Sequence, residues 1–183
     1  DPNTPTTLYA GTNARGLFKS TNGGGSWTLA NSGVVGADVW SLAPLQSGLL
    51  FHASLSAVSD TTDPYVVHTS LGLTGNVDPA RLRRAAQNLI DRNPGLRTAF
   101  AHASDGTPVQ VVVSGVAVPW TEIDLSDVDR SDVRRDRVQQ IIDRERRNGF
   151  EIGVPPLLRF ILVAFGQGDY QLLLVNHHIV LDG

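Results

Sequence analysis

The sequence predicts a mixed α/β lobe that follows a short all-β segment. Residues 1–36 are rich in Gly, Asn, Thr and Ser, with brief apolar runs between turn signals. From about residue 37 the composition shifts to Leu, Val, Ala, Asp and Arg, and apolar residues recur at both helical and strand spacing. We therefore predict a domain boundary near residue 36 and an α/β (α+β) fold, with a mixed sheet and flanking helices, over residues 37–183.

The composition excludes several classes of function. With 183 residues, 41% of them apolar and 18% charged, the chain can bury one sizeable core. A formal net charge of −3 gives no argument for nucleic-acid binding, and no apolar run or basic start suggests a membrane span or signal peptide. The lack of cysteine excludes disulfides and cysteine metal sites. Methionine is absent even at position 1, so we expect the chain to be part of a longer reading frame or a processed product.

The first segment has the pattern of a β-meander. Turn signals at residues 13–16 and 22–25 contain glycines, which accept positive φ at little steric cost. Between and beside these turns lie runs typical of short strands. The expected strands are Thr7–Gly11, Gly16–Ser20 and Ser26–Ala30.

Residues 20–27 resemble the Asp-box (Ser-x-Asp-x-Gly-x-x-Trp) of sialidase-like β-propellers, with Asn22 in place of the aspartate. In that family the box stabilises a turn between two strands, packs its Trp into the blade and does no chemistry. A single unit cannot bury both faces of its sheet. We therefore expect a hairpin appendage without an activity of its own.

Three helices are expected in the second segment. Asp78 and Ser131 can cap the second and third, Pro79 suits the first position of the second, and Gly149 suits the position after the third. Apolar residues at helical spacing form stripes at Leu82, Ala85, Ala86, Leu89 and Ile90, and at Val138, Ile141 and Ile142. The expected helices are Leu42–Leu55, Asp78–Arg92 and Ser131–Asn148.

Five strands are expected in the same segment. Two of them should pair around the turn at residues 104–106, and the last two are joined by a turn at residues 166–169. The last two are rich enough in Leu and Val to lie buried in the middle of a sheet. The expected strands are Tyr65–Leu73, Leu96–Ala101, Val109–Val113, Leu157–Phe165 and Tyr170–Asn176.

The chain ends on the pattern His-His-x-x-x-Asp-Gly at residues 177–183, directly after the last apolar run. This pattern resembles the active-site motif of the condensation domains of nonribosomal peptide synthetases. Residues 41–52 resemble the first helix of that family, residues 92–100 its second motif, and residues 156–159 the strand before its active site. Asn93 and Ser47 depart from the residues common in the family, histidine and glutamate.

The resemblance implies a chloramphenicol-acetyltransferase-like fold, with the active-site histidine in a tunnel between two lobes. The matched residues form only the N-terminal lobe, truncated after the motif, so we expect the chain to be inactive alone. The implied parent reaction is amide formation, in which an aminoacyl amine on one carrier protein attacks an acyl or peptidyl thioester on another.

The resemblance also implies the partners. These are the donor and acceptor peptidyl carrier protein domains and the missing C-terminal lobe, with no nucleic acid and no membrane. No cofactor is bound directly, since the substrates are carried on the phosphopantetheine of the carriers. The implied location is cytoplasmic.

The motif assigns His178 as the catalytic residue, because the second histidine has this role in the family. An imidazole suits the reaction because its pKa lies near the working pH. Whether His178 acts as a base or positions the amine is left open. His177 is expected to support the fold.

The remaining site residues are structural in the family. The resemblance gives Asp182 the role of pairing with an arginine that fixes the loop, with Arg97 as the expected partner and Arg159 as the alternative. A buried carboxylate without a partner is costly, so either arginine could matter for folding. Gly183 is expected to let the backbone turn close to the substrate path.

Other chemistries have weaker support. His52, His68 and His102 match no metal spacing, and adjacent histidines on a strand face opposite ways, so no metal site is expected. The arginines of residues 131–148 alternate with acids, as on a solvated helix face, with a carrier-protein contact as the alternative. The glycines at residues 23–25 lack the Lys-Ser/Thr of a phosphate loop.

Three alternatives remain open at this point. The chain could be a non-catalytic fusion or binding module with a β-propeller-type segment, or an acyltransferase of the same superfamily that uses coenzyme A. The join near residues 33–38 could be artificial.

Overall fold

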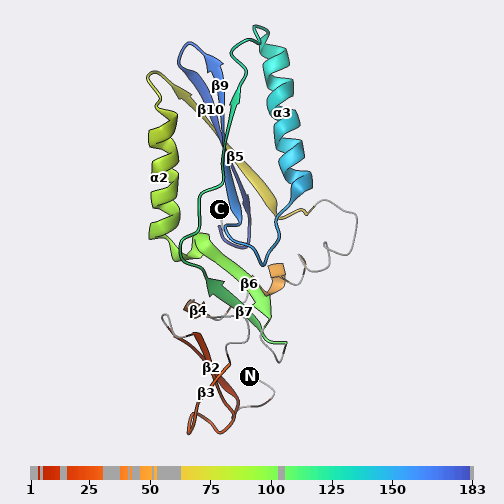
Figure 1. Cartoon of the computed structure of the whole chain (residues 1–183). Coiled ribbons are helices and arrows are strands. Elements are labelled where there is room, and N and C mark those ends of the chain that lie inside the picture. The colour runs from red at the N-terminus through yellow and green to blue at the C-terminus, as the bar shows by residue number, and fades with distance from the viewer. Residues whose placement is uncertain are drawn as a thin grey trace.

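The computed structural model describes residues 4, 6–12, 16–30, 38–40, 42, 46–50, 52, 63–102 and 106–181. The molecule is elongated (Figure 1). A four-stranded sheet flanked by two long helices occupies one end, a three-stranded sheet follows it, and a second three-stranded sheet, built from the first residues of the chain, occupies the other end.

The main sheet has the strand order β5-β10-β9-β8. Its strands are β5 (Val66–Thr74), β8 (Trp120–Asp124), β9 (Leu158–Gly166) and β10 (Asp169–His177). β10 pairs antiparallel with both β5 and β9, whereas β8 runs parallel to β9. The two apolar runs predicted to lie in the middle of a sheet, β9 and β10, are its central strands.

Helix α2 (Pro79–Arg92) begins as the sequence predicts. The Asp78 carboxylate accepts a hydrogen bond from the Arg81 backbone N–H at 3.1 Å, which satisfies one of the free donors of the first turn. The predicted apolar stripe is only partly buried. Leu89 is 45% exposed, and Ala85 is also exposed.

Helix α3 (Ser131–Asn148) has the predicted bounds, but its predicted cap was wrong. Arg130, and not Ser131, occupies the N-cap position, and no side chain caps the first turn. Gly149 follows the helix with a φ of 53°, a conformation that glycine adopts without strain.

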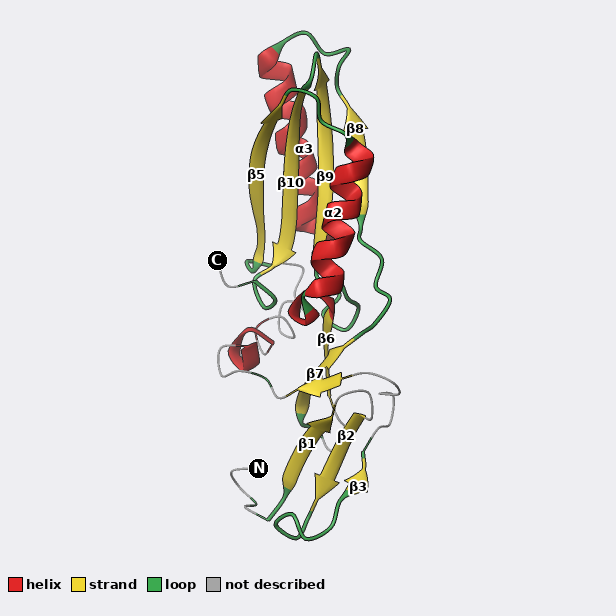
Figure 2. Ribbon diagram, turned by 90° about the vertical axis from the view of Figure 1, so that its left-hand side faces the viewer, coloured by secondary structure: helices red, strands yellow, loops and turns green. Residues whose placement is uncertain are grey.

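Two apolar cores lie on opposite faces of the main sheet, because α2 covers one face and α3 the other (Figure 2). Successive side chains of a strand point to opposite faces, so β9 contributes to both cores. The α2 core contains Ala86, Ile90, Leu158 and Phe160, and the α3 core contains Val138, Ile141, Ile142, Ile161 and Val163. No helix in the described part of the chain is long and apolar enough to cross a bilayer.

The second sheet has the order β4-β7-β6. It contains the predicted pair, β6 (Thr98–His102) and β7 (Pro108–Val112), and is extended by β4 (Asp38–Trp40). A short 3-10 helix, η1 (Pro94–Arg97), precedes β6, and its last two residues take the place of the start of the predicted strand Leu96–Ala101. Neither β4 nor β8 was predicted.

The predicted helix Leu42–Leu55 is described only in part. Residues 46–50 and residue 52 are helical, and they lie within the predicted range. Leu49 and Leu50 are buried in a small core with Phe100, Leu157 and Ile179. Apart from residue 42, the rest of this prediction lies outside the described residues.

The first segment forms the predicted antiparallel meander. Its strands are β1 (Leu8–Thr12), β2 (Gly16–Ser20) and β3 (Thr28–Leu29). Residues from both edges of the meander pack on the second sheet, so the meander is attached to the rest of the molecule through apolar contacts. The residues in this contact are Tyr9, Ala30, Ala101, Val109 and Val111.

The turn between β2 and β3, here called the Asn22 turn (residues 20–27), is held by its own side chains. Oδ1 of Asn22 accepts the Ser26 backbone N–H at 2.8 Å and the Ser20 hydroxyl at 2.9 Å. The Ser20 hydroxyl oxygen in turn accepts the Gly24 N–H at 2.9 Å. Trp27 is 42% exposed, whereas the Asp-box resemblance implies a Trp packed into the blade.

Candidate functional site at the histidine turn

The two histidines lie where the central strand β10 ends. His177 is the last residue of β10, and a turn follows it; we call residues 177–181 the histidine turn. Backbone hydrogen bonds fix the turn to both neighbouring segments. The His177 N–H donates to the Leu157 carbonyl at 3.0 Å, and the His178 N–H donates to the Tyr65 carbonyl at 2.8 Å.

The His177 side chain is fully buried. Its Nε2 lies 3.1 Å from Oδ2 of Asp63, and its Nδ1 accepts the Ile179 backbone N–H at 3.1 Å. An N–H can only donate and a carboxylate can only accept, so these partners assign the ring proton to Nε2. The ring is therefore a neutral bridge between Asp63 and the histidine turn.

Electrostatics favour the same neutral form. Burial lowers the pKa of His177, and the neighbouring His178 lowers it further. The charge of Asp63 and its hydrogen bond oppose this effect without reversing it, because the net direction is downward. At neutral pH the His177 ring thus remains uncharged.

His178 has the opposite tautomer. Its ring is half-buried, and its Nδ1 lies 2.8 Å from the Leu181 carbonyl oxygen. A carbonyl can only accept, so Nδ1 carries the proton and, in the neutral ring, Nε2 carries the lone pair. The turn therefore orients two adjacent imidazoles differently: Nε2 of His177 donates, whereas Nε2 of His178 is the basic nitrogen.

Arg97, the predicted partner of Asp182, is half-buried in η1. Its Nη1 donates to the Val113 carbonyl at 2.9 Å, while its buried Nε has no hydrogen-bond partner in the described part of the chain. A buried N–H donor without an acceptor is energetically costly, so a further acceptor at Nε of Arg97 would be stabilising. Asp182 and Gly183, the other two predicted site residues, lie outside the described residues.

Arg159, the alternative partner, is already engaged. Its Nη1 lies 2.6 Å from Oε2 of Glu145, and its Nη2 donates to the Gly149 carbonyl. The guanidinium also lies 4.1 Å from the centroid of the Phe150 ring. These contacts tie β9 to the end of α3, so Arg159 has a structural role independent of Asp182.

An apolar hollow of about 460 Å³ borders the histidine turn. Its lining includes residues of the second motif, namely Asn93 and the first three residues of η1. It also includes two residues of the histidine turn, Val180 and Leu181. The two motifs that lie far apart in the sequence thus share one surface. The lining residues are Leu89, Asn93, Pro94, Gly95, Leu96, Leu158, Phe160, Leu174, Val180 and Leu181.

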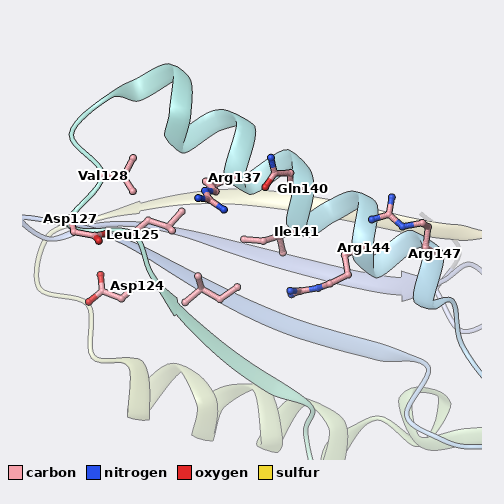
Figure 3. Close-up of a pocket in the computed structure, with 10 residues that line it drawn as sticks. Asp124, Leu125, Asp127, Val128, Arg137, Gln140, Ile141, Arg144 and Arg147 are labelled. Atoms are coloured by element: carbon pink, nitrogen blue, oxygen red, sulfur yellow. The ribbon is translucent and has the colours of Figure 1, made fainter.

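A second hollow, of about 610 Å³, lies between β8 and α3 and contains no residue of the histidine turn (Figure 3). Arg137, Arg144 and Arg147 line it from α3, and Asp124 and Asp127 line it from the end of β8 and the loop after it. Asp124 pairs with the far end of β9, away from His177. The mixture of exposed charges agrees with a solvated helix face.

Two residues of the site, Asp63 and Tyr65, were not predicted from the sequence. Asp63 contacts His177 across 114 positions of sequence. Tyr65 accepts the His178 N–H, and its ring centroid lies 6.1 Å from that of His177 and 5.9 Å from that of His52. The available signal was the Asp-Pro-Tyr sequence at residues 63–65, which is typical of a turn before a strand.

A model of the Condensation domain family matches residues 37–183. Gramicidin S synthase 2 of Brevibacillus brevis is 32% identical over 146 residues, which are 80% of this chain and 3% of that protein. Bacitracin synthase 1 of Bacillus licheniformis is 28% identical over 145 residues, which are 79% of this chain and 3% of that protein. The chain thus spans a few per cent of the length of these relatives.

Two solved structures have a similar fold. The first condensation domain of the calcium-dependent antibiotic synthetase, in complex with a substrate analogue, aligns with a TM-score of 0.66 and 21% identity, over 76% of this chain and 34% of that one. The starter condensation domain of rhizomide synthetase aligns with a TM-score of 0.67 and 20% identity, over 79% of this chain and 34% of that one. Since the family match begins at residue 37, it lends no support to the propeller resemblance of residues 1–36.

Proposed function

Because the chain belongs to the condensation domain family, we propose that it supplies the histidine-bearing lobe of an amide-forming acyltransferase in a nonribosomal peptide synthetase. The observation that carries the proposal is the tautomer of His178. With Nδ1 donating to the Leu181 carbonyl, the neutral ring has its lone pair on Nε2, the form that an attacking amine requires of a nearby base or acceptor.

In the proposed reaction, the neutral amine of the acceptor attacks the carbonyl carbon of the donor thioester. A C–N bond forms, the C–S bond breaks, and the thiol of the donor carrier leaves, so the amine loses one proton and the thiolate gains one. Nε2 of His178 accepts the N–H of the amine, by hydrogen bond or by proton transfer. Placing two tethered substrates side by side lowers the barrier in addition.

The partners follow from the proposed reaction. Donor and acceptor carrier proteins would present both substrates on phosphopantetheine, and the chain itself would bind no cofactor. A second lobe would complete the tunnel, since this chain spans only 34% of the solved condensation domains described above. A cytoplasmic location and a domain boundary near residue 36 remain predictions.

We assign Arg97 as the partner of Asp182. Arg159 is occupied by Glu145 and Gly149, whereas Nε of Arg97 lacks an acceptor in the described part of the chain. This difference favours Arg97, as the family resemblance does. Its role in the proposed site is structural: the pair would hold the end of the histidine turn against η1.

The proposal is tested with a chimaera in which residues 37–183 replace the matching segment of gramicidin S synthase 2. The chimaera is given loaded donor and acceptor carriers, and the dipeptidyl product is measured by mass spectrometry. His178→Ala should lower the rate of product formation about a hundredfold or more. An active chimaera whose rate is unchanged by His178→Ala would refute the role of this residue.

Two further arms separate the alternatives. The chain alone should give no product with the same carriers. Acyl-coenzyme A donors should not replace the loaded donor carrier in the chimaera. Equal rates with coenzyme A thioesters would favour the coenzyme A-dependent acyltransferase. A chimaera that folds, as judged by its circular dichroism, but forms no product with either donor would favour the non-catalytic module.

A further inference from the structure

Asp63 receives two hydrogen bonds from groups of different kinds. Its Oδ1 accepts the Tyr65 backbone N–H at 2.9 Å, and its Oδ2 lies 3.1 Å from Nε2 of His177. The Asp63 side chain is only 15% exposed, and His177 is fully buried. A single carboxylate therefore joins the entrance of β5 to the imidazole at the end of β10.

The Asp63 side chain is held in place by its own turn. The Val66 N–H donates to the Asp63 carbonyl at 3.3 Å, which closes a four-residue turn with Pro64 at its second position. Proline fixes φ at that position, so the turn is ordered by its own residues and does not depend on the contact with His177. Oδ2 is therefore directed at the ring without a large loss of side-chain entropy.

The same residues close a ring of hydrogen bonds around the histidine turn. From Asp63, one branch runs through the Tyr65 backbone, whose carbonyl accepts the His178 N–H at 2.8 Å. The other branch runs through the His177 ring, whose Nδ1 accepts the Ile179 N–H at 3.1 Å. Both backbone amides that flank the His178 side chain are thus linked to one carboxylate, each through one intervening residue.

We propose that Asp63 is a positioning residue: it locks His177 as the Nε2–H tautomer and thereby sets the orientation of the His178 ring. This inference extends the proposed function, because it names a further residue for the same site. In the described part of the chain, the hydrogen bonds of the Asp63 carboxylate join it to His177 and to the Tyr65 backbone. It acts only through His177 and Tyr65.

The carboxylate is needed because both of its partners are donors. An asparagine has nearly the same shape but offers one acceptor oxygen and one NH₂ donor. If its oxygen accepts from Tyr65, its NH₂ group meets Nε2 of His177 and favours the other tautomer, which places a proton on Nδ1 opposite the Ile179 N–H. If its oxygen accepts from His177 instead, the Tyr65 N–H loses its acceptor. Asp63→Asn therefore disturbs this closed set of hydrogen bonds while keeping the volume of the side chain.

The test uses the whole chain and long-range ¹⁵N–¹H NMR of the histidine rings, which distinguishes protonated from unprotonated ring nitrogens. In the wild type we expect His177 as the Nε2–H tautomer and His178 as the Nδ1–H tautomer. In Asp63→Asn and Asp63→Ala we expect the signals of His177 to shift towards the Nδ1–H form or a mixture of tautomers. The signals of His178 should broaden or shift with them.

Asp124→Ala is the matched control. The Asp124 carboxylate also accepts a backbone N–H two residues on, that of Ser126 at 2.8 Å, but it lies at the far end of the main sheet. It should leave both histidine spectra unchanged. If Asp63→Asn folds and leaves both spectra as in the wild type, the positioning role is refuted. If Asp63→Ala fails to fold, Asp63→Asn decides alone.

Activity separates this inference from the proposed function. In the chimaera described above, Asp63→Asn should lower the rate of product formation about tenfold, less than His178→Ala, as expected for a residue that orients another. A chimaera in which His178→Ala has no effect refutes the catalytic role and leaves the NMR result standing. Changed spectra with an unchanged rate would refute the positioning role in catalysis.

Discussion

The Asn22 turn and the histidine turn are both stabilised by side-chain hydrogen bonds, but their partners differ. Each reverses the chain after a strand, and in each a side chain satisfies backbone amides. Among the described residues, the side chain of Asn22 bonds to Ser20 and Ser26 of its own turn, and it lies exposed on the meander. His177 bonds to its own turn and to Asp63, 114 residues away, and is fully buried. A self-contained turn can be changed locally, whereas a turn joined to a distant segment depends on the whole sheet.

The largest effect is expected from His177→Ala. It removes a buried ring and takes away the His177 partner of the Ile179 N–H and of Oδ2 of Asp63, so the free energy of unfolding should fall by about 3 kcal/mol or more. His178→Ala, which alters a half-buried ring, should cost about 1 kcal/mol. Urea unfolding of both variants, followed by tryptophan fluorescence, measures the difference. Equal losses of unfolding free energy in the two variants would mean that both rings contribute equally to stability.

A smaller loss is expected from Gly168→Ala, in the turn at the other end of β10. Gly168 has a φ of +76°, and a Cβ added there would lie 2.8 Å from the Gly75 carbonyl oxygen. Strain of this kind should cost about 2 kcal/mol in the free energy of unfolding. The ring signals of His177 and His178 should not change, because the substitution lies at the far end of the strand. A change in tautomer would show that instability alone disturbs the histidine turn.

The stability of the fold should depend on pH through His177. Burial lowers the pKa of His177 in the folded chain, so below about pH 6.5 the unfolded chain binds more protons than the folded one. The free energy of unfolding should therefore fall as the pH drops below this value, by at most about 1.4 kcal/mol per pH unit for one proton. Urea unfolding between about pH 7.5 and pH 5 measures this slope.

The control for the pH profile is His68→Gln. The pKa of His68 is also lowered, mainly by burial and then by Arg146, so His68 adds to the slope with the same sign. The slope that remains in His68→Gln is the share of His177 together with that of any other group that titrates in the range. A flat profile in His68→Gln would contradict the buried neutral state of His177.

The smallest effects are expected in the Asn22 turn. Asn22→Ala removes the acceptor of the Ser26 N–H and should cost about 1 kcal/mol. Asn22→Asp keeps that acceptor and should stay within about 0.5 kcal/mol of the wild type. Neither should alter the histidine spectra. A shift of the His177 signals in Asn22→Ala would show that the meander and the histidine turn are coupled.

The sequence predicted most of the regular structure because local patterns determine it. The bounds of α3, the Asp78 cap of α2 and the central place of β9 and β10 all follow from periodicity and from capping residues. Strand β8 was missed because Trp120–Asp124 mixes polar and apolar residues at the edge of the sheet, where its polar side chains remain exposed. The cap of α3 was wrong because serine one position into the helix resembles a capping serine in the sequence.

The site was predicted only where the motif is contiguous. His177 and His178 are adjacent in sequence, and the family resemblance gave their roles as predictions. The contact between Asp63 and His177 spans 114 positions, and no local pattern indicates it. The opposite tautomers of the two rings follow from hydrogen-bond partners that only the folded backbone supplies, namely the Ile179 N–H and the Leu181 carbonyl.

The long span of the Asp63–His177 contact also sets an order of events in folding. Residues so distant in sequence meet late, because closing a long loop is entropically unfavourable until the intervening strands have paired. The His178 ring, and with it Nε2, therefore takes its final orientation only after β5 and β10 have paired. In amide hydrogen exchange, His178 and Ile179 should exchange as slowly as the centre of the sheet, unlike the amides of an ordinary surface turn. A chain that has not completed its sheet would thus lack an aligned imidazole.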